Sequence, residues 1–280
     1  MINKKYKDRL FCLLFGNEEY KDNILSLYNA LCNTSYTNTD DIQIYTIEDV
    51  IYIKMKNDVS VLLDSFLYLW EQQSTFNPNM PIRGLLYFGK MYDKYITENH
   101  LNIYGKTLIK LPTPKYTVLY NGMDEQPAFM QLRLSDSFIN PDTSGDFEWT
   151  ANMVNLNDGK NDDLLDKCQP LKEYMILINE IRKNSVSMGF EDAVDTAVTD
   201  CIEHNVLKSF LLKHRAEVLD VCITEYNEKS FVDGIREEGR EEGQNLLATV
   251  VLRLRNGETP EQILSSGVDA KTIELAETIK

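Results

Sequence analysis

The chain has 280 residues, 43% of them hydrophobic and 10% aromatic, so it is long enough to bury a sizeable core. Its formal net charge of −15 weighs against a surface that attracts nucleic acid as a whole, because such a field repels phosphate at long range. The five cysteines are scattered, odd in number and without CxxC spacing, which argues against a disulfide framework and for a reducing compartment.

The apolar runs are too short to span a membrane. The longest of them are interrupted by Asp64 or end at Glu71, far below the ~20 residues that a membrane span needs. No apolar signal segment follows the first five residues. We therefore expect a soluble, cytoplasmic protein with no membrane partner.

The sequence before Leu171 predicts a mixture of helices and strands. Helical spacing of apolar residues predicts a helix over 10–31, broken at Gly16-Asn17, and a second helix over 80–95 that opens at Pro81. Alternation and β-branched or aromatic content predict strands or strand-like segments at 42–56, 59–63, 66–70, 115–120 and 147–156.

From Leu171 onward the sequence predicts helices alone, and the change indicates an α/β core followed by a helical region. We expect a domain over 1–232 whose second half is helical, a charged helical linker over 233–256 that contains the repeat REEGREEG, and a tail over 257–280. Thr259, Pro260 and Gln262 form a helix-start signal in that tail, which resembles a helix-turn-helix. A packing or oligomerisation role is equally open, because its second helix has few basic side chains.

The strands at 59–63 and 66–70 would form a hairpin closed by Asp64-Ser65. That register pairs Leu63 with Phe66 and, extended outward, places Asp58 opposite Glu71 on one face. Gln73 lies on the same face, because side chains alternate along a strand, and a one-residue slip would scatter the three groups. Both faces of the hairpin are otherwise apolar, which predicts strands in the middle of a covered sheet.

Two carboxylates at the edge of such a core are costly when desolvated, and they raise each other's pKa. A divalent cation removes both problems, and the few hard oxygen ligands suit Mg²⁺ or Mn²⁺, which can activate water and stabilise charge on a phosphoryl group. The alternative is that Asp58 and Glu71 flank a hairpin and face water.

Several sequence blocks, in this order, resemble the Rpn family of recombination-promoting nucleases, also described as PD-(D/E)XK nuclease family transposases. The likeness runs from about residue 8 to 243 and is carried by YNAL (28–31), KNDVS (56–60), EQQSTFNPNMPIRGLLY (71–87), IKLPTPKYTVLYNG (109–122), LSDSF (134–138) and REEGREEG (236–243). The resemblance implies a restriction-endonuclease-like α/β core with a central mixed sheet flanked by helices. It also implies metal-dependent cleavage of DNA.

The resemblance implies roles for four residues. Asp58 and Glu71 fall on the metal-binding carboxylates, Gln73 falls on the superfamily's lysine, and Asp8 falls on an acidic helper position near the first helix. Gln73 lacks the positive charge of lysine, so it could orient water or phosphate only by hydrogen bonding. Arg83, in the helix after the motif, is a candidate contact for DNA phosphate, or a surface or packing arginine.

Two further functions remain open, binding without catalysis and true transposition. The chain could be a catalytically inactive nuclease-fold protein that binds DNA or a protein partner, which the acidic charge and Gln73 favour. The C-terminal helices could also join two copies of the chain. True transposition rests on the family label alone.

Overall fold

The structure, a computed structural model, describes residues 6–45, 59–142, 144–255, 258–265, 268 and 270–279. The chain divides into two compact units, Met1–Glu225 and Tyr226–Lys280. The sequence places this boundary after residue 232, which lies within the helix α7 (Lys208–Arg255) that runs from one unit into the other.

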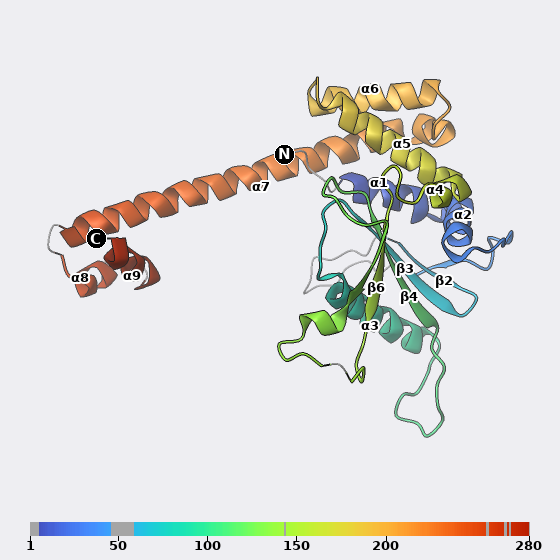
Figure 1. Ribbon diagram of the computed structural model, residues 1–280, viewed down its shortest axis with the longest axis horizontal. Helices are drawn as coiled ribbons and strands as arrows, with labels where there is room; N and C mark the ends of the chain where they lie inside the picture. The colour runs from blue at the N-terminus through green and yellow to red at the C-terminus, as the bar shows by residue number, and fades with distance from the viewer. Residues whose placement is uncertain are drawn as a thin grey trace. The chain divides into compact units, whose positions relative to one another are not determined.

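The core of the first unit is a mixed sheet, as expected (Figure 1). Within the described residues it has six strands in the order β1-β2-β3-β4-β6-β5. The central strands β3, β4 and β6 are parallel, whereas β1, β2 and β5 pair antiparallel with their neighbours. The bounds are β1 Gln43–Ile44, β2 Val59–Leu63, β3 Phe66–Gln73, β4 Thr113–Tyr120, β5 Phe129–Arg133 and β6 Thr150–Asn155.

The hairpin of β2 and β3 has the predicted register. Val59 pairs with Trp70 and Leu63 with Phe66, across the two-residue turn at Asp64-Ser65. Both turn residues are left-handed, with φ of 52° and 65°, which matches the right-handed twist of the flanking strands. The predicted register is therefore confirmed from Val59 onward. Asp58 lies outside the described residues, so its place opposite Glu71 stays a prediction.

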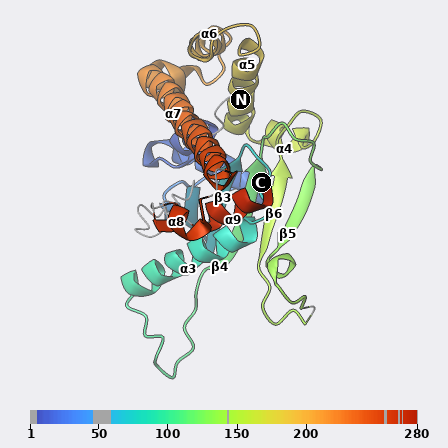
Figure 2. The same ribbon diagram turned by 90° about the vertical axis from the view of Figure 1, so that its left-hand side faces the viewer.

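Helices cover both faces of this sheet (Figure 2). The helix α3 (Met80–Glu98) packs on one face, where Met80 and Phe88 share a core with Leu67 and Leu69 of β3. On the other face Tyr68 makes an edge contact with Tyr28 of α2, at 5.3 Å between ring centroids. The helices on that side are α1 (Tyr6–Phe15), α2 (Lys21–Cys32) and α5 (Gln169–Asn184). The sequence therefore anticipates a strand pair covered on both sides.

The remaining helices of the first unit are α4 (Asp162–Lys167) and α6 (Phe190–Glu203), with short 3-10 turns at Glu18–Tyr20 and Leu134–Ser137. The segment predicted to be a charged helical linker is helical and belongs to α7, which ends at Arg255. The helix α7 bends at His214, whose φ of −110° is not helical. Of the parts described here, β5 and α4 were not predicted from the sequence.

The second unit has its own small core. The helices α8 (Pro260–Ser265) and α9 (Ala270–Ile279) bury Ile263, Ile273 and Ala276 together with Val250 and Leu254 of α7. The predicted helix start is confirmed, because Gln262 and Thr259 exchange hydrogen bonds of 2.9 and 3.4 Å between each side chain and the other's amide. In the described part of the chain, no helix is both long and apolar enough to cross a membrane.

The hairpin turn offers a test of the register through stability. Ser65 is exposed and left-handed, so Ser65→Gly should raise the free energy of unfolding by about 0.5–1 kcal/mol, because glycine adopts positive φ without steric cost. Urea denaturation followed by tryptophan fluorescence measures the difference.

The matched control is Ser65→Ala, which removes the same hydroxyl but keeps the Cβ atom and should bring no gain. A glycine variant no more stable than the alanine variant would contradict the left-handed turn.

Candidate functional site

The carboxylate of Glu71 lies at the carboxyl end of β3, on the face that α3 covers. Its side chain is 0% exposed. One oxygen, Oε1, accepts a hydrogen bond from Nη2 of Arg83 at 2.7 Å, and the two side chains form an ion pair. The other oxygen, Oε2, accepts from the hydroxyl of Tyr116 on β4. Each oxygen of this buried carboxylate therefore has a donor from a different element of the fold.

Arg83 extends the cluster to its neighbours on β3 and α3. Its Nη2 also donates to the hydroxyl of Tyr87, one helical turn later, at 3.3 Å. With the amide of Gln73 turned so that both ends are matched, its oxygen accepts from Nη1 of Arg83 at 3.2 Å and its nitrogen donates to the carbonyl of Thr75 at 3.3 Å. Arg83 thus touches both Glu71 and Gln73, which confirms that these two side chains share a face.

A glycine brings α3 close enough to form this cluster. A Cβ atom on Gly84 would lie 2.4 Å from Cε1 of Tyr116 and 2.9 Å from Nε1 of Trp149, both closer than real Cβ contacts. The helix can therefore approach β4 only because residue 84 has no side chain. That approach sets Arg83, the preceding residue, against the end of β3.

The charges in the cluster shift one another's proton affinity. Burial raises the pKa of Glu71, while Arg83 and the two tyrosine hydroxyls act in the opposite direction with smaller effect. Burial, reinforced by the negative charge of Glu71, raises the pKa of Tyr116 well above its usual value, so Tyr116 stays a neutral donor. Desolvation alone would lower the pKa of Arg83, but Glu71 outweighs it and the net pKa is raised. Arg83 therefore stays positively charged beside the buried carboxyl group.

Gln72 lies between Glu71 and Gln73 in the sequence, and its side chain points to the opposite face of the sheet. Gln72 is buried, and its Nε2 donates to Oδ1 of Asn121 at 2.7 Å. Asn121 contacts the hydroxyl of Tyr174 on α5 at 3.4 Å, and that hydroxyl donates to the carbonyl of Lys7 at 3.1 Å. Asp8 raises the pKa of Tyr174 by its charge, after the larger effect of burial. Asp8 therefore lies on the α1–α5 side of the sheet, whereas Glu71 faces α3.

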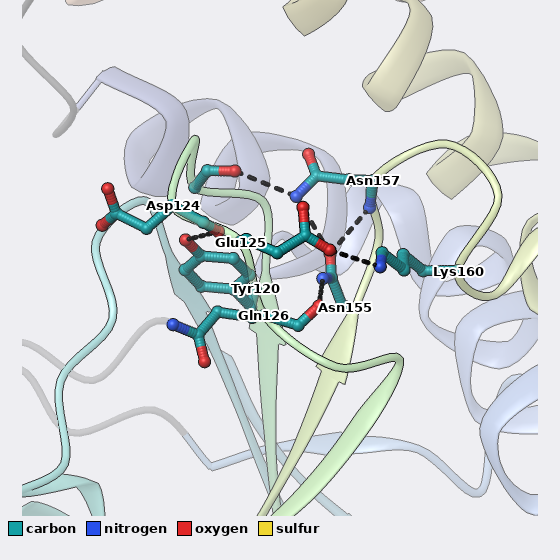
Figure 3. Close-up of polar contacts among 8 residues, drawn as sticks. Tyr120, Asp124, Glu125, Gln126, Asn155, Asn157 and Lys160 are labelled. Atoms are coloured by element: carbon teal, nitrogen blue, oxygen red, sulfur yellow. Dashed lines mark hydrogen bonds and ion pairs between the residues drawn. The ribbon is translucent and has the colours of Figure 1, made fainter.

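A second polar region lies beyond the carboxyl ends of β4 and β6 (Figure 3). It encloses about 320 Å³, and its side chains fasten the loop after β4 to the loop after β6. Asn155 and Asn157 donate to the carbonyls of Gln126 and Gly122, each at 2.9 Å. The hydroxyl of Tyr120 donates to the carbonyl of Asp124, and Lys160 pairs with Glu125 at 2.8 Å. Most of these groups bind backbone or each other, so the region acts as a clamp on the loop.

Sequence reasoning missed three members of the Glu71 cluster. Tyr87 could have been found, because it follows Arg83 by four residues and so shares its helix face. Tyr116 and Gly84 could not, because their roles depend on the parallel pairing of β3 with β4, which are separated along the chain by the whole of α3.

The donor set fits a metal ion only in part. The carboxylate of Glu71 and the amide oxygen of Gln73 are hard ligands of the type that Mg²⁺ prefers. In the arrangement seen here, however, the cation next to both is the guanidinium of Arg83. Among the described residues, no group of three or more His, Cys, Asp or Glu side chains gathers in a way that could hold a metal. The second predicted carboxylate, Asp58, lies outside them.

No protein-family model, no curated protein and no solved structure matches this chain. The geometry of the chain itself therefore carries the functional interpretation.

The close packing of α3 against β4 can be tested with two glycines of the same helix, of which the second serves as the control. Gly84→Ala should lower the free energy of unfolding by roughly 1–3 kcal/mol, because the new methyl group must displace the rings of Tyr116 and Trp149. Gly89→Ala should raise it by about 0.5–1 kcal/mol, because Gly89 is exposed, has open space around it and lies in the same helix. Urea denaturation of the two variants measures both shifts, and shifts of the same sign would contradict the close approach at Gly84.

Proposed function

We propose that this chain is a metal-dependent DNA endonuclease of the PD-(D/E)XK type, related to the recombination-promoting nucleases. The observation that carries the proposal is the fully buried carboxylate of Glu71 at the end of a central strand, with Gln73 on the same face. The mixed sheet covered by helices on both faces supports the same fold.

The hairpin register supports a second carboxylate at the same place. The pairs observed from Leu63–Phe66 to Val59–Trp70 have no bulge, and one further step would pair Asp58 with Glu71. Together these two carboxylates would hold Mg²⁺ or Mn²⁺. When bound, the ion supplies a water of lowered pKa and stabilises negative charge on the scissile phosphate.

The remaining residues of the cluster would position the substrate. Gln73 can orient the attacking water through its amide, but it carries no charge. The charge that lysine supplies in the superfamily motif stands beside it on Arg83, whose Nη1 lies 3.2 Å from the Gln73 amide oxygen. A guanidinium suits phosphate, because it can donate two parallel hydrogen bonds. DNA is therefore the partner that this proposal requires. Asp8 lies on the other side of the sheet from this cluster.

The second candidate is a catalytically inactive protein with the same fold, which binds DNA or a protein partner. The ion pair of Glu71 with Arg83 favours it, because a paired carboxylate is a weaker metal ligand. The net charge of −15 favours a protein partner over DNA.

Cleavage of supercoiled plasmid in the presence of Mg²⁺ or Mn²⁺ separates the two candidates. Glu71→Gln and Asp58→Asn keep side-chain shape but remove one ligand charge each, so each should slow nicking by about 100-fold or more. EDTA should abolish nicking by the unaltered protein. Asp8→Asn tests the helper assignment in the same assay.

The matched control is Asp93→Asn, which removes an exposed carboxylate from α3 and should leave the rate unchanged. Nicking that survives both Glu71→Gln and Asp58→Asn would contradict the assigned site. Binding of DNA without cleavage by the unaltered protein would favour the inactive candidate.

A further inference from the structure

The guanidinium of Arg83 stands between the carboxylate of Glu71 and solvent. Glu71 is 0% exposed, and Tyr87 and Tyr116 beside it are 2% and 3% exposed. The side chain of Arg83 is 25% exposed. An ion that reaches Glu71 along this side of the cluster must therefore pass the position that the guanidinium occupies.

Placing a divalent cation and the guanidinium of Arg83 on the carboxylate of Glu71 together costs repulsion energy. The buried charge of Glu71 requires a counter-charge, and Arg83 provides it at 2.7 Å. A divalent ion bound to the same carboxylate would lie within a few ångströms of the guanidinium, where the repulsion is poorly screened by water. The metal and the guanidinium therefore compete for Glu71.

We propose that Arg83 is a built-in counterion that pairs with Glu71 and is displaced from it when a divalent cation binds. This inference rests on the proposed function, because it concerns the regulation of the same site. While the guanidinium is in this closed position, the carboxylate is neutralised from within the chain.

The contacts of Arg83 allow such a displacement. Among the described residues nothing accepts a hydrogen bond from its buried Nε, so the closed position leaves one donor unsatisfied. The side chain begins in the first turn of α3 and already reaches solvent, so it can leave without movement of the helix. Once released, its Nε–Nη edge is free to bind a phosphate through two parallel hydrogen bonds.

The test measures binding of Mn²⁺ alone to the full chain, from the free-ion electron paramagnetic resonance signal at mildly alkaline pH. Arg83→Gln keeps a hydrogen-bond donor without the charge, and Arg83→Met removes both. Each should bind Mn²⁺ about tenfold or more tightly than the unaltered protein, because the competing cation is gone. Arg83→Lys keeps the charge and should bind within about threefold of the unaltered protein.

Circular dichroism establishes which variants are folded, and one folded neutral variant is sufficient for the comparison. A residue with only a structural role would not increase metal affinity when replaced, so tighter binding by the neutral variants supports the exchange. Neutral variants that bind Mn²⁺ no more tightly than Arg83→Lys would overturn the inference and leave the metal-dependent function standing. Absence of Mn²⁺ binding in all four proteins would overturn both.

Discussion

One buried charge determines how this side of the molecule is built. Removing a carboxylate from water costs several kcal/mol unless other groups replace the lost hydration. For Glu71 the replacement comes from Arg83 on α3 and from Tyr116 on β4. The cluster is therefore complete only when α3 lies close over both β3 and β4. Gly84 permits that distance, so a residue without a side chain and a residue with a buried charge depend on each other.

The three polar residues that end β3 impose the same requirement on both faces of the sheet. Glu71 and Gln73 are held by Arg83 on the α3 side, and Gln72 is held by Asn121 on the α1–α5 side. A shift of β3 by one residue would send each group to the wrong face, where its partner is absent. The polar end of the strand thus fixes the register more strictly than its apolar part, because both faces of the apolar part are hydrophobic.

The features that could be predicted from the sequence are those set by contacts between residues close together along the chain. The hairpin register could be predicted because five consecutive pairs cross a two-residue turn, and the start of α3 could be predicted because Pro81 fits a first helical turn. The short strand β5 was missed because it pairs only with β6, from which residues 134–149 separate it along the chain. In the site, the shared face of Glu71 and Gln73 followed from alternation. Tyr116 did not, because parallel strands are brought together by a crossover whose geometry the sequence does not state.

The run of Glu71, Gln72 and Gln73 after an apolar strand could have marked a strand leaving the core. Glu71 and Gln72 are instead fully buried, so the polar run lies inside the protein. For stability alone, a buried ion pair is a poor choice, because well-packed hydrophobic residues of similar volume serve as well or better. The pair of Glu71 and Arg83 is thus not explained by packing. The proposed nuclease chemistry, which needs a carboxylate at the end of β3, would account for the pair, and the guanidinium of Arg83 stabilises that buried charge.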